Sequence, residues 1–166
     1  YECPQLRSVT IGQSVTNIGR DAFYQATSLA SVVIPGSVMD IGYDAFYECT
    51  SLANLTIENA ATRIGDWAFY GCTNLAIADF GNNLAYIGRG AFYGCSRLAS
   101  LEIPDSVTTI GDYPFEECTG LNRVIIGNGL TYLGRWLFSS CNFLLASTRP
   151  IFICSSSEYF WPNSFN

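Results

Sequence analysis

The sequence contains no lysine and no histidine, and only 13% of its 166 residues are charged. Without histidine, neither a Ser-His-Asp nor a Cys-His catalytic arrangement can be built. Without lysine, Schiff-base chemistry and a Walker-type phosphate loop are also excluded. The glycines form no GxGxxG cluster, so nothing indicates a bound dinucleotide. These absences argue against an enzyme, and we expect no catalytic residues and no cofactor.

Positive charge is scarce as well, with eight arginines against 14 acidic residues and a formal net charge of −6. Nucleic acids and anionic membranes are bound by clustered Lys and Arg, so this balance argues against both partners. No apolar run approaches the roughly 18 residues of a membrane span, which argues against membrane insertion. The chain opens at Tyr1, in the middle of a repeat and without a signal peptide, which predicts a fragment of a longer protein.

What the chain has in abundance is internal repetition, with a period of 23 residues. Each period carries a leucine, then an Ile-Gly or Leu-Gly pair, then a phenylalanine four residues after that glycine. The agreement of these positions in every period predicts one structural unit per repeat. The leucines are Leu6, Leu29, Leu52, Leu75, Leu98, Leu121 and Leu144, and the phenylalanines are Phe23, Phe46, Phe69, Phe92, Phe115 and Phe138.

One part of each repeat has the alternation of a short strand, followed by turn residues. In the second repeat, Leu29, Val32 and Ile34 should face inward and Val33 outward. The return half, Ile-Gly-x-x-Ala-Phe-x-x-Cys, is too short for a long helix and predicts turns and short 3₁₀ segments. Its glycine should take a backbone angle or a close contact that a Cβ would forbid. The phenylalanines should form a buried ladder.

We therefore predict a leucine-rich-repeat solenoid of the right-handed β/α superhelix class over residues 1–146. A parallel sheet of short strands should form one face, with turns and short 3₁₀ segments on the other. The pattern breaks after Leu144, because Ser147 and Arg149 stand where apolar residues are due. Residues 147–166 are therefore expected to form an atypical C-terminal capping segment.

The pattern Leu-x-x-Val-x-Ile-Pro-x-Ser-Val-x-x-Ile-Gly-x-x-Ala-Phe-x-x-Cys-x-x-Leu closely resembles the BspA-type class of leucine-rich repeats. The best match runs from Leu29 to Leu52, with a second from Leu98 to Leu121. Members of this family are typically secreted or located at the cell surface, and several are adhesins that bind host proteins. The resemblance therefore implies a secreted or cell-surface location and a binding role.

Six of the seven cysteines share one position of the repeat, and Ala26 occupies that position in the remaining repeat. Alanine fills a small apolar slot but cannot bind metal or pair with sulfur. A buried ladder of free thiols is therefore the preferred interpretation. A disulfide between adjacent coils is the alternative, and zinc is disfavoured because no close ligand pair and no histidine exist. The six are Cys3, Cys49, Cys72, Cys95, Cys118 and Cys141, while Cys154 lies outside the register.

A column of tyrosines follows four successive ladder phenylalanines. The last two repeats place Glu116 and Ser139 at the same position, so it must tolerate water. Half-exposed packing beside the phenylalanine ladder would explain the column. The functional alternative is a stripe for a binding partner, because tyrosine is enriched at interfaces. The four residues are Tyr24, Tyr47, Tyr70 and Tyr93.

Acidic residues gather on the outward face of the predicted strands. In the 23-residue register, Asp79 and Glu102 are neighbours, Glu58 lies on a diagonal from Asp79, and Arg123 on a diagonal from Glu102. Neighbouring like charges destabilise a sheet, so the pair needs a reason. Tolerance on a wet face, helped by Arg123, is one. A patch for a cationic group of a partner, or a weak Ca²⁺ site, is another.

The sequence thus favours a non-enzymatic extracellular or cell-surface module that binds a protein or a glycan. A structural spacer or subunit of a larger surface assembly is the alternative. A third hypothesis is a carboxylate-dependent hydrolase, because paired carboxylates are the one catalytic chemistry that the composition allows.

Overall fold

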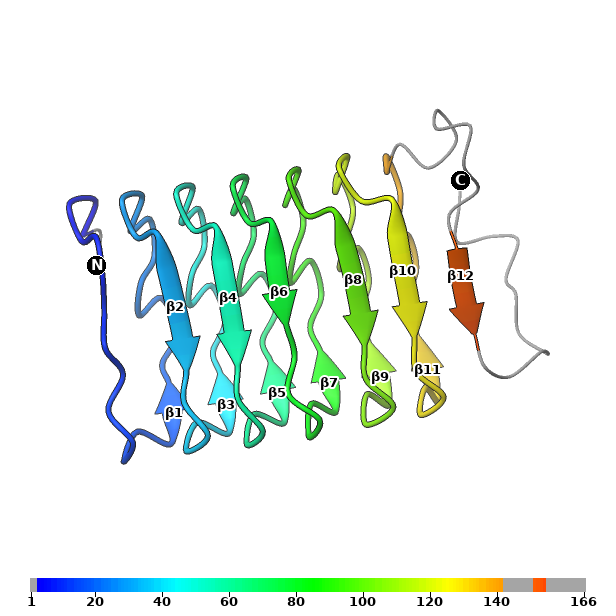
Figure 1. Cartoon of the computed structure of the whole chain (residues 1–166), viewed down its shortest axis with the longest axis horizontal. Coiled ribbons are helices and arrows are strands. Elements are labelled where there is room, and N and C mark those ends of the chain that lie inside the picture. Colours follow the sequence, from blue (N-terminus) through cyan, green and yellow to red (C-terminus); the bar gives the residue numbers. More distant parts are fainter. Residues whose placement is uncertain (1–2, 142–150, 155–166) are drawn as a thin grey trace.

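The chain winds into a solenoid in which each coil contributes one long and one short strand. The computed structural model describes residues 3–141 and the strand Ile151–Cys154. Figure 1 shows the long strands along one side and the short strands behind them, running in the opposite direction. The long strands are β2 (Ser31–Ile34), β4 (Asn54–Ile57), β6 (Ile77–Asp79), β8 (Ser100–Ile103), β10 (Arg123–Ile126) and β12 (Ile151–Cys154). The short strands are β1 (Asn17–Ile18), β3 (Asp40–Ile41), β5 (Arg63–Ile64), β7 (Tyr86–Ile87), β9 (Thr109–Ile110) and β11 (Tyr132–Leu133).

We call the face of the long strands the sheet side, and the face of the short strands and the turns after them the return side. All strand pairs are parallel, and Ser31 pairs with Asn54, 23 residues further on. The six short strands form one sheet in chain order. The predicted parallel solenoid is therefore confirmed.

The last coil is longer than the others. Arg123 of β10 pairs with Ile151 of β12, which is 28 residues further on. The next strand therefore begins at residue 151, and this is why the 23-residue register finds polar residues at Ser147 and Arg149. Apart from β12, the predicted capping segment of residues 147–166 lies outside the described residues, and its boundary at 146 stays a prediction.

The sheet side is interrupted at its middle. The long strands form two three-stranded sheets, β2-β4-β6 and β8-β10-β12, and no ladder joins β6 to β8. The interruption coincides with a change in the volumes of the core side chains. The coil of β6 has Ala78 where the adjacent coils have leucine, and Phe80 where they have isoleucine. The ring of Phe80 packs against Phe92 with centroids 5.4 Å apart.

The predicted 3₁₀ segments and the β/α class are not confirmed, because the part of the chain that the structure describes contains no helix. Successive β-turns replace them, with hydrogen bonds from Ala45 N to Gly42 O and from Cys49 N to Phe46 O. The third residue of these turns has a positive φ, 53° at Asp44 and 52° at Glu48. A left-handed residue cannot continue a right-handed 3₁₀ helix, so the chain turns at both places.

The interior matches the prediction from alternation. Leu29, Val32 and Ile34 are buried, and Val33 is exposed. The six phenylalanines stack along the axis with centroids 4.9 to 5.7 Å apart. Four of them are fully buried, namely Phe46, Phe69, Phe92 and Phe115. The ladder thus fills the core of every central coil.

The cysteine ladder is also confirmed, and the disulfide alternative is wrong for the six described cysteines, which are all free. The Cys72 thiol donates a hydrogen bond to the carbonyl oxygen of Phe46 in the preceding coil, with sulfur and oxygen 3.2 Å apart. The Cys95 thiol does the same to Phe69 at 3.3 Å. Burial raises the pKa of the Cys72 thiol well above its usual value. The ladder cysteines therefore bridge coils as neutral donors.

This arrangement predicts a sharp contrast in thiol reactivity. In the native protein under non-reducing conditions, a thiol reagent such as dithionitrobenzoate should modify the exposed Cys3 at once. Cys72 and Cys95 should react only after unfolding, because a buried neutral thiol is a poor nucleophile. Peptide mapping by mass spectrometry after timed labelling checks this. Rapid labelling of Cys72 in folded protein would contradict the ladder.

Candidate functional site: two exposed sides of the solenoid

The acidic residues of the sheet side do not converge on one site. Glu58 and Asp79 line an open hollow of about 590 Å³ at the strand ends, whereas Glu102 lines a neighbouring one of about 510 Å³. Asn82 borders both. The interruption between β6 and β8 falls between Asp79 and Glu102, so these two residues are not a ladder pair. The Glu58 carboxylate accepts a hydrogen bond from Gly36 N at 2.6 Å, which gives it a structural role.

Arg123 also departs from its predicted role. It pairs in register with Ser100, and Ile125 pairs with Glu102, so the predicted diagonal with Glu102 is present. No ion pair joins the two side chains, however, since the ion pairs among the described residues are Arg20–Asp21 and Arg63–Asp40. The sheet side therefore offers dispersed charges between exposed apolar residues such as Val33 and Ile77.

The return side concentrates the aromatic residues. Of the 10 tyrosines in the sequence, Tyr1 and Tyr159 lie outside the described residues, and the other eight all come from the short strands and the turns after them. Trp67 and Trp136 lie there too. Besides the predicted Tyr24, Tyr47, Tyr70 and Tyr93, the set comprises Tyr43, Tyr86, Tyr113 and Tyr132.

The predicted tyrosine column is an ordered stack. Tyr24 and Tyr47 lie 4.9 Å apart between ring centroids, Tyr47 and Tyr70 4.6 Å, and Tyr70 and Tyr93 5.0 Å. The planes of successive rings deviate by 8 to 18° from parallel. All four rings are half-buried, as the packing interpretation requires. Their exposed edges form a continuous rigid surface.

Trp67 extends this stack sideways. Its ring meets Tyr70 edge-on at 5.6 Å and Tyr93 at 6.3 Å between centroids. It lies directly over Gly90, where any Cβ would collide with the indole. On the other side, the Arg89 guanidinium stands 5.5 Å from the Trp67 ring and 5.4 Å from the Tyr113 ring. The result is one contiguous aromatic–arginine cluster over three coils.

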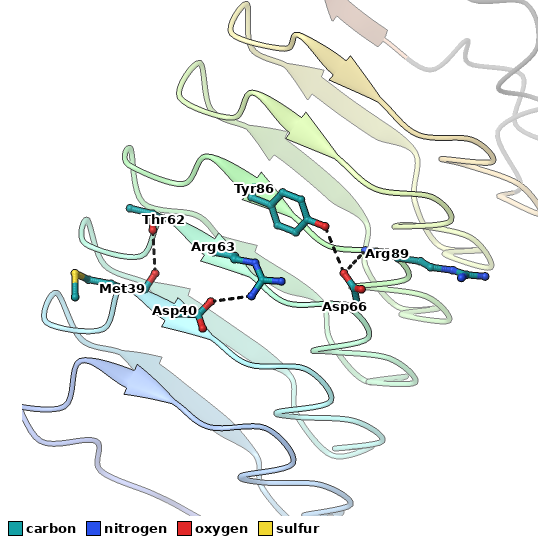
Figure 2. A network of polar contacts seen from close by, with 7 residues as sticks. All are labelled: Met39, Asp40, Thr62, Arg63, Asp66, Tyr86 and Arg89. Atoms are coloured by element: carbon teal, nitrogen blue, oxygen red, sulfur yellow. Dashed lines mark hydrogen bonds and ion pairs between the residues drawn. The ribbon is translucent and has the colours of Figure 1, made fainter.

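Polar contacts run from coil to coil beside this cluster. Arg63 donates to the Asp40 carboxylate at 3.4 Å, and its guanidinium lies 5.2 Å from the Tyr86 ring. Asp66 accepts from Arg89 N at 3.0 Å and lies 3.5 Å from the Tyr86 hydroxyl (Figure 2). The side-chain bonds hold Arg63 and Tyr86 in place before any partner arrives, and the bond from Arg89 N holds the backbone at that residue.

Burial and neighbouring carboxylates raise the pKa of several side chains in and beside the tyrosine stack. The Tyr93 hydroxyl donates to Glu117 at 2.8 Å, and this bond, with burial, raises the pKa of Tyr93. Burial, reinforced by Glu117, also raises the pKa of Glu116, against the opposing hydrogen bond from Ser139. Burial raises the pKa of Tyr47 to about 12, assisted by Glu48. Tyr47 and Tyr93 therefore stay neutral throughout the physiological range.

Asp44 is held in an unfavourable setting. One carboxylate oxygen is buried without a hydrogen-bond partner, and this burial, together with the neighbouring Asp21, raises the pKa of Asp44 to about 6. Because the pKa of Asp44 in the folded chain lies above its ordinary value, the ionised side chain destabilises the fold. The penalty is absent below the unfolded pKa and develops as pH rises through the folded pKa.

Replacing Asp44 with asparagine should therefore raise the melting temperature at pH 7.5 and leave it nearly unchanged at pH 4. Asparagine tolerates the left-handed backbone of this position, so the variant isolates the charge. Thermal unfolding followed by circular dichroism at both pH values checks this. An equal shift at the two pH values would show that the effect is not electrostatic.

The sequence analysis did not predict Trp67, Arg89 and Tyr113 as candidate binding residues. One pattern points to them, because aromatic and arginine residues recur at the first and second positions after the Ile-Gly pair. It was weak because those positions alternate between aromatic, acidic and basic residues from coil to coil.

Metal binding and membrane insertion find no support in the residues that the structure describes. No group of three or more Cys, Asp or Glu side chains there could hold a metal ion, so the predicted weak Ca²⁺ site stays without support. Within the same residues, no helix is long and apolar enough to cross a bilayer.

The fold and the repeat pattern define a leucine-rich-repeat solenoid. The BspA type leucine-rich repeat region matches in 6 copies, over residues 1–118 and 86–166, and the chain therefore belongs to this family. Among curated proteins, none matches this chain.

Solved structures of bacterial leucine-rich-repeat proteins share the fold. A leucine-rich repeat protein from Bacteroides ovatus has 29% identity and a TM-score of 0.75 over 82% of this chain, which spans 36% of that protein. The leucine-rich repeat protein of T. pallidum has 25% identity and a TM-score of 0.67, covering 82% of this chain and 77% of its own. A leucine-rich cell surface protein from Faecalibacterium prausnitzii has 24% identity and a TM-score of 0.53, and the match covers 96% of this chain and 56% of that protein.

Proposed function

We propose that the chain is a non-enzymatic recognition module of a secreted or cell-surface protein, and that it binds a protein partner through its return side. The observation that carries this proposal is the gathering of all described tyrosines, two tryptophans and four arginines on that one side. Trp, Tyr and Arg are the residues that most often dominate the binding energy of protein interfaces.

The geometry supports the same conclusion. The cluster around Trp67, Arg89 and Tyr113 is contiguous and lies near the middle of the described solenoid, where an interface places its anchors. The stacked rings are already ordered, so binding would cost little side-chain entropy. The cell-surface neighbour with the same fold and the membership of the BspA-type family support the proposed location.

A pair of surface variants tests which side binds. Purified extracellular proteins and glycans are presented to the immobilised chain, and each ligand found is measured again with Trp67→Asn combined with Tyr93→Ser. Asparagine suits the positive φ of residue 67, so the fold should persist. The control is Val33→Ser with Ile77→Ser, which removes apolar side chains that are 54% and 59% exposed on the sheet side.

We expect affinity to fall about 100-fold or more in the Trp67/Tyr93 variant, the scale of lost interface anchors, and to change little in the control. Loss of binding in the control alone would move the site to the sheet side and its acidic residues Glu58, Asp79 and Glu102. A solution mass measurement tests the alternative of a structural spacer. An ordered oligomer that covers the return side would favour assembly over recognition.

A further inference from the structure

On the return side, the turns that follow the short strands combine aromatic rings with carboxylates. Three repeat positions contribute these side chains: the left-handed residue after Ile-Gly-x, the tyrosine position, and the left-handed residue after the tyrosine. We call this surface the turn band. Its aromatic members are Tyr24, Tyr47, Trp67, Tyr70, Tyr93, Tyr113 and Trp136, and its acidic members are Asp21, Asp44, Glu48, Glu116 and Glu117.

No cationic side chain occupies these positions in the described coils. Arg20 approaches from the adjacent position but is bonded to Asp21 at 3.4 Å, and Arg89 stands between the rings of Trp67 and Tyr113. Two other carboxylates accept hydrogen bonds from neutral donors: Glu48 from Gln25 at 2.8 Å and Glu117 from Tyr93 at 2.8 Å. Glu48 and Glu117, at the two ends of the tyrosine stack, therefore lie outside the ion pairs of the described residues, whereas Arg20 partly offsets the charges of Asp21 and Asp44.

The carboxylates are spaced by the coils. Glu48 belongs to the second coil and Glu117 to the fifth, and successive coils stack at the spacing of parallel strands, so three steps separate their backbones by about 14 Å. Between them the same position is occupied by Gly71 and Gly94, which have no side chains. The nearest atom to a Cβ at Gly94 would be the Cα of Gly71, 3.9 Å away, whereas a Cβ at Gly71 would lie 3.1 Å from the Glu48 side chain. The Glu48 side chain therefore reaches over Gly71, and the open part of the interval lies at Gly94. The rings of Tyr70 and Tyr93 occupy the adjacent turn-band position in the same two coils.

We infer that the turn band receives an extended, basic segment of a protein partner, with two Arg or Lys side chains four residues apart. An extended chain advances about 3.3 Å per residue and returns to the same face every second residue, so residues i and i+4 lie about 13 Å apart on one face. One cation would reach Glu48, the other Glu116 and Glu117, and residue i+2 would lie against Tyr70 and Tyr93. Opposite charges favour this partner. The inference rests on the proposed return-side interface and specifies the chemistry of its partner.

The probe is a fluorescein-labelled peptide, Gly-Arg-Ser-Tyr-Ser-Arg-Gly, whose binding to the full chain is measured by fluorescence anisotropy in 0.15 M salt. Three further peptides place the arginines two residues apart, six residues apart, or replace both with aspartate. Because exposed ion pairs are weak, we expect the four-residue spacing to bind about five-fold more tightly than either other spacing. The aspartate peptide should not bind.

Matched protein variants localise the effect. Glu48→Gln with Glu117→Gln removes two charges from the turn band and retains the oxygens that accept from Gln25 and Tyr93. Asp79→Asn with Glu102→Gln removes the same charge from the sheet side. The first pair should weaken the best peptide about five-fold, and the second by less than about two-fold.

Equal weakening by both pairs, equal affinity at every spacing, or no binding of the arginine peptides would overturn the inference. A different result would contradict the proposed function, namely loss of ligand binding in the Val33/Ile77 control alone. A ligand that is lost in the Trp67→Asn, Tyr93→Ser variant but has no basic segment would leave the return-side interface standing and refute only the basic partner.

Discussion

Replacing Phe69 with alanine should lower the free energy of unfolding by about 3–5 kcal/mol, the usual cost of deleting a buried aromatic ring. Phe69 is fully buried, and its ring stacks on Phe46 and on Phe92 with centroids 5.1 Å apart on both sides. Neighbouring coils cannot close over the cavity, because the strands on both sides of the core fix the distance between them. Urea unfolding of the variant and the unmodified chain measures the difference.

Tyr70→Ala provides the control in the adjacent position. Its ring is half-buried and also stacks on two neighbours, but water already reaches its edge, so the loss should be clearly smaller than at Phe69. Equal losses at Phe69 and Tyr70 would mean that the tyrosine stack is as structural as the phenylalanine ladder. The tyrosine stack would then be part of the structural core, with no need of a binding partner to explain it.

The periodic part of the fold was predictable because one coil repeats the environment of the next. Leu29, Val32 and Ile34 point inward because side chains alternate along any strand, and Ala26 in the cysteine column favoured a ladder of free thiols over a metal site or disulfides. The interruption of the sheet side was not predictable from a consensus pattern. It coincides with Ala78 in β6 and Phe80 directly after it, where one core side chain is smaller and the other larger than in the adjacent coils.

The candidate site was only partly predictable. The tyrosine column repeats at one position and was found, whereas Trp67, Arg89 and Tyr113 occupy two different positions of three successive coils. Their contact depends on turns, in which neither the two-residue nor the 3.6-residue period applies. It depends also on Gly90, which leaves room for the indole of the coil before it. For the acidic residues of the sheet side, the repeat register was sufficient to predict that Asp79 and Glu102 occupy equivalent positions of adjacent coils. It could not predict that the hydrogen-bonded ladder between β6 and β8 is absent, so that the two residues do not pair.

The second large effect is expected at Gly88, one of the glycines that follow the short strands. A Cβ on Gly88 would lie 2.5 Å from the backbone nitrogen of Asp66 and 2.6 Å from the carbonyl oxygen of Gly65. Both are backbone atoms of the preceding coil, which no side-chain rotation can move. The predicted need for glycine is thus confirmed as a close contact, since Gly88 is not among the residues with positive φ.

Gly88→Ala should therefore destabilise the chain by about 3 kcal/mol or more, at or beyond the upper end of ordinary overpacking, because two coils must separate to admit one methyl group. Gly19→Ala is the matched control. Gly19 occupies the same repeat position in the first coil, where nothing lies within 4 Å of the added Cβ. There the substitution should leave stability unchanged or raise it by up to about 1 kcal/mol, because alanine restricts the unfolded chain. Urea unfolding of the two variants decides the matter. A similar loss in both would mean that this position needs glycine for its backbone conformation, and the close approach of coils would not be its cause.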